Sequence, residues 1–205
     1  MTEIKICGLM RRADVLAAKE ADHLGFVVAT GTRRSLDLPR AKDLMSSAGR
    51  PTVAVTTATD PAVVIRLVNG LRPDAVQLSG PVGRESFLRV CSEAGCDVWA
   101  VVHIGRGIPP LDHEMLSLAD RVVLDTASPQ GGGTGERHDL DISAGLVREL
   151  GPRTGLAGGL TPENVAAAVA KVRPYMVDVS SGVETDGTKD AGKMARFIDE
   201  VRACR

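Results

Sequence analysis

Two short segments of this chain each end a run of apolar residues with a side chain that can exchange a proton. Cys7 ends one such run near the start of the chain, and Asp125 ends another beyond the midpoint. A thiol, with a reference pKa of about 8.5, can act as a base near neutral pH once that pKa is lowered modestly. A carboxyl group whose pKa is raised by burial can donate a proton. The two residues therefore predict general acid–base chemistry.

Glycine-rich segments follow each of the last two apolar runs. They contain Gly158-Gly159 and Ser181-Gly182. Glycine lets the backbone approach a ligand closely, so the N–H groups of such segments can bind a phosphate. A third run, at residues 131–135, could fold over the same phosphate. A proton-transfer pair beside a phosphate site is typical of a sugar-phosphate isomerase.

The composition limits the other classes of function. The chain has 205 residues, of which 43% are hydrophobic and 2% aromatic, and its formal net charge is −1. Nothing in this charge or aromatic content predicts nucleic-acid binding. The start of the chain does not resemble a signal peptide, and no apolar run approaches the roughly 20 residues of a membrane span. The four cysteines form no C-x-x-C motif, so we expect a reduced, cytoplasmic protein.

Strand-like runs alternate with amphipathic segments along the whole chain. The predicted strands are residues 4–8, 23–28, 51–57, 75–80, 97–104, 121–126, 155–160 and 176–182. The predicted helices are residues 13–21, 39–48, 60–69, 84–94, 112–119, 141–150, 161–171 and 189–202. Asp60-Pro61 and Thr161-Pro162 place a capping residue before a first-turn proline, which is typical of a helix start.

Eight strand–helix alternations predict an α/β fold in which parallel strands are joined by right-handed crossovers. The closed form is the (β/α)8 TIM barrel, here expected as a single domain over residues 1–205. A doubly wound open sheet is the competing fold, but no G-x-G-x-x-G follows the first strand. The glycine-rich segments come after the seventh and eighth strands, where phosphate sites recur in barrels. A helix starting at Thr161 would add its N-terminus to this anion site.

Alternation along the strands predicts which side chains point into the barrel, because residues two apart share a face. Lys5 and Cys7 alternate with apolar neighbours and are expected inside, as are His103, Asp125 and Asp178. Closure makes the first and eighth strands neighbours, so we expect Lys5 to pair with Asp178, since an unpaired buried charge is unfavourable. The positive charge of Lys5 should also favour the Cys7 thiolate.

Six segments, taken in order along the chain, carry a more specific signal. They are Lys5-Ile6-Cys7-Gly8, Leu124-Asp125-Thr126, Gly132-Gly133-Thr134-Gly135, residues 156–165, residues 177–184 and Gly187-Thr188-Lys189-Asp190. In this order and spacing, across nearly the whole chain, they resemble the phosphoribosylanthranilate isomerase family. The resemblance implies an Amadori rearrangement in tryptophan biosynthesis, which converts the aminoaldose N-(5′-phosphoribosyl)anthranilate into an aminoketose.

The resemblance also implies roles for individual residues. Asp125 would be the general acid that protonates the ribose ring oxygen, and Cys7 the general base that removes the proton from C2′. Arg34 would pair with the anthranilate carboxylate, with Arg33 a near-equal candidate because the local match can slip by one residue. The phosphate would be held by Gly158, Gly159, Ser181 and Gly182. Further substrate-binding candidates are Asp178, His103 and Gly135.

Several positions depart from the pattern of the family, and they fall where the aglycone should bind. Ser79 stands where a histidine is usual, His103 where an arginine is usual, and Glu136 where a lysine is usual. Two alternatives therefore stay open. One is an isomerase with a rebuilt anthranilate pocket, and the other is a paralogue with the same chemistry on a different phosphoribosylamine. A broader enzyme that also takes the amide substrate of histidine biosynthesis is a minor variant.

Two other classes of function fit the sequence less well than the isomerase. A non-catalytic barrel that binds a sugar phosphate should lack the acid or the base, but both are present. A metal-dependent epimerase would need clustered inward ligands, and only His103, Asp125 and Asp178 are candidates. We therefore expect no metal, no cofactor and a small phosphoribosyl substrate as the only partner. The sequence is compatible with a monomer or a homodimer.

Overall fold

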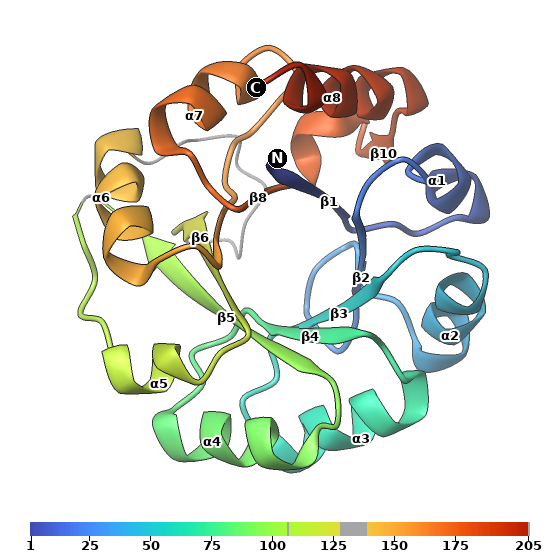
Figure 1. The fold of residues 1–205 in the computed structure, drawn as a ribbon. Helices are drawn as coiled ribbons and strands as arrows, with labels where there is room; N and C mark the ends of the chain where they lie inside the picture. The colour runs from blue at the N-terminus through green and yellow to red at the C-terminus, as the bar shows by residue number, and fades with distance from the viewer. Residues whose placement is uncertain (106, 128–138, 205) are drawn as a thin grey trace.

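Parallel strands pair in chain order and close into a barrel at the centre of the molecule (Figure 1). The structure, a computed structural model, describes residues 1–105, 107–127 and 139–204. Within these residues the barrel strands are β1 (Glu3–Cys7), β2 (His23–Val27), β3 (Thr52–Thr56), β4 (Ala75–Leu78), β5 (Asp97–Ile104), β6 (Arg121–Thr126), β7 (Thr154–Leu156) and β8 (Met176–Val179). The predicted (β/α)8 barrel is confirmed, and β8 pairs with β1 to close it.

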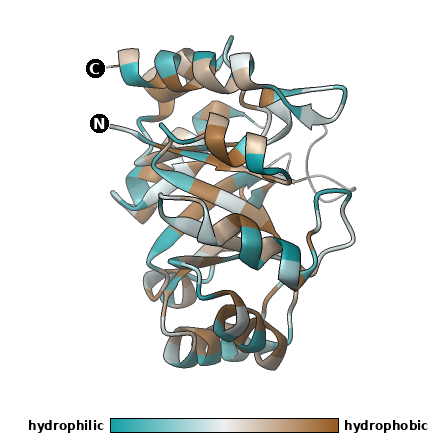
Figure 2. Cartoon of the chain, turned by 90° about the vertical axis from the view of Figure 1, so that its right-hand side faces the viewer, coloured by the Kyte–Doolittle hydropathy of each residue, from teal (hydrophilic) through white to brown (hydrophobic). Residues whose placement is uncertain are grey.

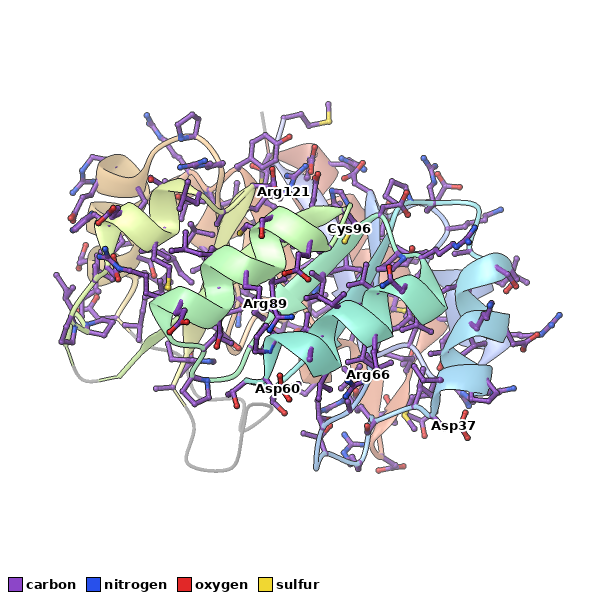
Figure 3. All side chains as sticks on the ribbon, turned by 90° about the horizontal axis from the view of Figure 1, so that it is seen from below. Asp37, Asp60, Arg66, Arg89, Cys96 and Arg121 are labelled. Carbon is purple, nitrogen blue, oxygen red and sulfur yellow. The ribbon has the colours of Figure 1, made fainter. Side chains whose placement is uncertain are left out.

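Helices follow the strands and surround the barrel (Figure 1). They are α1 (Arg12–Ala17), α2 (Leu38–Ser46), α3 (Pro61–Leu71), α4 (Arg84–Glu93), α5 (His113–Ser117), α6 (Leu140–Leu150), α7 (Val165–Val172) and α8 (Ala191–Ala203). Figure 3 shows Asp37 and Asp60, which cap α2 and α3, at the end of the molecule opposite Arg121, which begins β6. Helices thus begin at the end of the barrel where strands finish. Among the described helices, none is long and apolar enough to cross a membrane.

Apolar side chains form one layer inside the barrel and another between the barrel and the helices. Ile4 and Ile6 pack outward in a large cluster with residues of the helices, whereas Cys7 belongs to the cluster inside the barrel. The predicted alternation along the first strand is therefore confirmed. Helix α8 shows both hydrophobic and hydrophilic bands, as expected for a helix with one buried side (Figure 2).

The helix predicted to begin at Thr161 instead begins at Val165, so that prediction was wrong. The side chain of Asn164 accepts a hydrogen bond from Thr161 N at 2.9 Å and donates one to Gly159 O at 3.0 Å. These bonds hold the segment in a turn, because an Asn side chain competes with the helical pattern of backbone hydrogen bonds. No helix N-terminus therefore begins at 161–163.

The ends of the seventh and eighth strands also differ from the prediction. β7 stops at Leu156, because Gly158 and Gly159 adopt positive φ angles of 87° and 64° that a strand cannot accommodate. After β8 the chain forms a short 3-10 helix, η1 (Ser181–Val183), and a small antiparallel pair of β9 (Glu184–Thr185) with β10 (Thr188–Lys189). Lys189 lies in this hairpin and not in the last helix, where it was predicted.

Candidate active site

A cavity of about 340 Å³ opens at the C-terminal ends of the barrel strands. Every strand or the residue just beyond it contributes to the wall, through Cys7, Val27, Val55, Gln77, His103, Asp125, Ala157 and Asp178. The loops after β7 and β8 complete the wall. The site thus brings together the predicted acid, the predicted base and the glycine-rich loops, at the end of the barrel where active sites form.

Lys5 and Asp178 form the predicted ion pair inside the barrel. Lys5 Nζ lies 2.8 Å from Asp178 Oδ2, and the Lys5 side chain is fully buried. Burial lowers the pKa of Lys5, but Asp178 and the neighbouring Cys7 outweigh it, so that the net pKa is raised. The second oxygen of Asp178, Oδ1, is buried without a hydrogen-bond partner among the described residues. Asp178 also lines the cavity, so it is available to a ligand group there.

Cys7 is buried on β1, two residues after Lys5 and on the same face of the strand. Burial raises the pKa of the Cys7 thiol and Asp178 raises it further, while Lys5 and Lys189 lower it only in part. The influence of Lys5 has the predicted sign, but the net pKa of the thiol is raised because the loss of solvent around the thiolate outweighs the nearby cations. Gly25 on β2 leaves room for this packing, since a Cβ there would lie 3.0 Å from Cys7 Sγ.

Asp125 has the raised pKa expected of a proton donor. Burial and the nearby negative charge of Asp178 raise its pKa to about 6, against the smaller opposing influences of His103 and of the N–H of Thr126. Thr126 N donates to Asp125 Oδ1 at 2.8 Å, which fixes the orientation of the carboxyl group. A minor fraction of the carboxyl groups therefore keeps its proton at pH 7, but a far larger one than for an ordinary aspartate.

Two of the departures from the family pattern, Ser79 and His103, meet on one wall of the cavity, while Glu136 lies outside the described residues. His103 is the register partner of Asp125 across β5 and β6, and its Nε2 lies 2.9 Å from the carbonyl oxygen of Ser79. Gln77 donates to Ser79 Oγ at 3.2 Å, and its own Oε1 is buried without a partner among the described residues. His103 thus faces the cavity, as the alternation predicted.

Two glycines allow close packing around the loops after β7 and β8: Gly158 packs against the end of β6, and Gly182 packs against the loop after β7. A Cβ on Gly158 would lie 2.1 Å from Thr126 Oγ1, and a Cβ on Gly182 would lie 1.8 Å from the carbonyl oxygen of Leu160. Both glycines line the cavity, together with Gly159 and Ser181. The four predicted phosphate-binding residues are therefore adjacent. Gly135, the remaining candidate, lies outside the described residues, as does the rest of the run at 131–135.

The structure distinguishes the two arginines after β2. Arg34 lines the cavity, and its side chain is 13% exposed. Arg33 is 53% exposed and instead donates to the carbonyl oxygen of Gly187 at the outer side of the loop. Both arginines contact Glu184, which is not among the predicted site residues. Glu184 and Lys189 lie in two of the matched segments, and only that position could have drawn attention to them.

The arrangement can transfer protons to and from a small ligand that lies between the acid and the base. Cys7 on β1 and Asp125 on β6 come from opposite sides of the barrel, with the glycine loops of β7 and β8 between them. An acid and a base so placed can act on two different atoms of the same ligand. Within the described residues, no group of three or more His, Cys, Asp or Glu side chains could hold a metal ion.

Comparisons with known proteins agree on one family. A family model described as N-(5′-phosphoribosyl)anthranilate (PRA) isomerase matches residues 4–200. The protein of that name from Methanothrix thermoacetophila is 38% identical over 214 aligned residues that cover both chains completely. The phosphoribosyl anthranilate isomerase of Thermus thermophilus superimposes with a TM-score of 0.86 at 31% identity, again over both full chains.

A further solved structure carries a ligand. It is a phosphoribosyl anthranilate isomerase in complex with reduced 1-(o-carboxyphenylamino)-1-deoxyribulose 5-phosphate. Its TM-score to this chain is 0.77 at 28% identity, and the match covers 98% of this chain and 99% of the other.

Proposed function

The chain belongs to the N-(5′-phosphoribosyl)anthranilate isomerase family and is an isomerase of tryptophan biosynthesis, and we propose that Cys7 and Asp125 carry its reaction. The observation that supports these roles is the raised pKa of Asp125, about 6, on the rim of a cavity that also holds the Cys7 thiol. A carboxyl group with that pKa is suited to donate a proton near neutral pH.

Asp125 acts first in the proposed mechanism. Its carboxyl group gives a proton to the ribose ring oxygen, the bond from C1′ to that oxygen breaks, and the nitrogen lone pair forms a C1′=N Schiff base. The Cys7 thiolate then takes the proton from C2′, and the electron pair left behind neutralises the nitrogen. The resulting enol becomes the ketone when its hydroxyl loses a proton and C1′ gains one. Proton exchange returns Asp125 and Cys7 to their starting forms.

Other parts of the site bind and orient the substrate in this proposal. The backbone N–H groups around Gly158, Gly159, Ser181 and Gly182 hold the phosphate, which glycine makes possible by allowing close approach. Arg34 pairs with the anthranilate carboxylate at the opposite wall. Asp178 offers its unpartnered Oδ1 to a substrate hydroxyl. His103 contacts the aglycone beside Ser79.

The alternative of a different phosphoribosylamine substrate is not needed. Relatives that match the full length of the chain share the anthranilate name, including one at 40% identity from Methanopyrus kandleri. The changes at Ser79 and His103 are then substitutions in the wall of an anthranilate pocket. We further propose that the chain works as one domain in the cytoplasm, which its free cysteines and its charged, phosphorylated substrate support.

Steady-state turnover tests the proposed roles. Freshly generated phosphoribosylanthranilate is followed through anthranilate fluorescence with the wild type, Cys7→Ala and Asp125→Asn. We expect robust turnover by the wild type and a loss of at least about 100-fold in each variant. Cys96→Ala is the matched control, because Cys96 lies outside the cavity. Full activity in either site variant would remove that residue from the mechanism.

A further inference from the structure

The carboxylate of Glu184 joins two separate parts of the active site. Glu184 begins the β9 strand, and its side chain is only 6% exposed. Its Oε1 accepts hydrogen bonds from Arg34 Nε at 2.8 Å and from Lys189 Nζ at 2.9 Å, while its Oε2 accepts from Arg34 Nη2 at 3.0 Å. Arg33 reaches the same carboxylate from the exposed side at 2.5 Å. One acidic side chain is thus surrounded by three cations.

The pairing with Glu184 determines which edge of Arg34 faces a ligand. A guanidinium group has five N–H donors in a plane, and the side-on pair uses the edge formed by Nε and Nη2. The end edge, formed by Nη1 and the second N–H of Nη2, is left for a bidentate partner, and Nη1 has no hydrogen-bond partner among the described residues. A carboxylate is the group that matches this edge.

Gly8 supports this placement of Arg34. A Cβ on Gly8 would lie 2.7 Å from Arg34 Cδ, so the arginine stem crosses directly over the residue that follows Cys7. The same Cβ would lie 3.1 Å from Ser180 Oγ. The arginine is therefore held at its stem by the backbone of the first loop and at its head by Glu184.

The second contact of Glu184 leads to the glycine loop after β8. Lys189 Nζ, whose side chain is 2% exposed, donates to the carbonyl oxygen of Ser180 at 2.8 Å and to Ser180 Oγ at 3.3 Å. Ser180 lines the cavity just before Ser181 and Gly182. Burial lowers the pKa of Lys189, and Glu184 opposes this. Without Glu184, Lys189 would be a buried cation beside a second cation, Arg34.

We propose that Glu184 is a positioning residue that holds the free edge of Arg34 toward the carboxylate of the aglycone. This inference rests on the proposed function, because it assumes that the ligand carries a carboxylate beside its sugar phosphate. Glu184 does not touch the substrate in this proposal. It acts on substrate binding through Arg34, and its bond to Lys189 gives that buried cation a partner.

Ligand pairs that differ only in the carboxylate test the proposal. Calorimetric titration compares reduced 1-(o-carboxyphenylamino)-1-deoxyribulose 5-phosphate with its phenylamino counterpart, which lacks the carboxylate. In Glu184→Gln we expect affinity for the first ligand to fall by about 10-fold or more, and for the second to change by less than about 2-fold. Glu93→Gln, which breaks an exposed ion pair with Arg89 on α4, is the matched control and should leave both affinities unchanged.

A second variant keeps the test decisive if Glu184→Gln does not fold. Glu184→Asp retains the charge that Lys189 needs but shortens the side chain, so it should show the same selective loss in weaker form. Equal losses for both ligands, or no loss for either, would overturn the role of Glu184. A folded wild type that neither isomerises phosphoribosylanthranilate nor binds either ligand would instead overturn the proposed function, and the inference with it.

Discussion

Lys5 and Asp178 form a buried ion pair that lies beneath both proposed proton-transfer residues. Lys5 Nζ and Asp178 Oδ2 are 2.8 Å apart, on adjacent strands that are separated by 173 positions in sequence. The two charges act in opposite directions on the same groups. Asp178 raises the pKa of both Cys7 and Asp125, and Lys5 lowers both. The net pKa of both groups is raised, because burial adds to the influence of Asp178.

The first prediction concerns the titration of Cys7. Lys5→Met should raise the pKa of the thiol further, because the largest stabilising charge near the thiolate is lost. Asp178→Asn should shift it in the opposite direction. The rate of Cys7 alkylation by iodoacetamide, followed by mass spectrometry as a function of pH, measures both shifts. An unchanged midpoint in Lys5→Met would show that the ion pair does not act on the thiol.

The second prediction concerns the pH dependence of turnover. The proposed reaction needs Asp125 protonated, with a pKa of about 6, and Cys7 deprotonated, with a raised pKa. Below about pH 6 the thiolate fraction rises with pH while Asp125 stays protonated, so kcat/KM should rise. Above it, the gain in thiolate and the loss of protonated Asp125 cancel, which gives a plateau up to the pKa of Cys7. A kcat/KM that declines steadily from pH 6 to 8 would contradict this assignment.

The third prediction is that Asp125→Asn stabilises the protein at neutral and alkaline pH. Because the folded pKa of about 6 exceeds the ordinary value of 3.8, wild-type stability is highest below the unfolded pKa and declines as pH rises through about 6. The variant lacks this decline and should gain on the order of 2–3 kcal/mol at pH 8. Urea unfolding at pH 4 and pH 8 measures the difference. If Asp125→Asn and the wild type differed in stability by the same amount at pH 4 and pH 8, the carboxyl group would have an ordinary pKa.

The fourth prediction compares two glycines. Gly158→Ala places a Cβ 2.1 Å from Thr126 Oγ1 at a φ of +87°, so the loop must shift. We expect a loss of about 1–3 kcal/mol of stability and a higher KM, because the proposed phosphate loop is displaced. Gly70→Ala in α3 is the matched control, since its Cβ would meet no atom within 4 Å. This control should gain about 0.5–1 kcal/mol of folding stability and keep a normal kcat and KM. A normal KM in Gly158→Ala would show that this loop does not contribute to substrate binding.

The fifth prediction concerns the opposite end of the barrel. Glu3 accepts hydrogen bonds from Tyr175 at 2.7 Å and Arg121 at 2.8 Å, and lies 2.8 Å from His23. Burial raises the pKa of Glu3, but these partners outweigh it and leave the pKa lowered. The ionised Glu3 therefore contributes to folding stability above its ordinary pKa of 4.5, and this contribution is lost as pH falls.

Glu3→Gln should consequently lose about 1–3 kcal/mol at pH 7 in thermal or urea unfolding, and less at pH 3. Its kcat and KM should stay normal, since this end of the barrel contributes stability and not chemistry. A changed KM in the folded variant would show that Glu3 influences substrate binding at the other end of the barrel.

Patterns along the chain were enough to predict the barrel, the inward direction of Cys7 and Asp125, and the pairing of Lys5 with Asp178. These features follow from a two-residue alternation and from the closure of the first strand on the eighth, which are properties of order along the chain. The start of α7 could not be predicted in the same way, because the side chain of Asn164 bonds to Thr161 and Gly159 in place of a helical turn.

The balance of forces at the site depends on packing that no pattern along the chain reveals. The net pKa of Cys7 depends on how completely its surroundings exclude water, and the sequence does not show that burial outweighs the charge of Lys5. The role of Glu184 emerges in the same way, because Arg34 lies 150 positions away in the chain and meets it only when the loops after β2 and β8 fold together. Solvent exclusion and the convergence of distant charges are properties of three-dimensional packing, so they appear only once the barrel has closed.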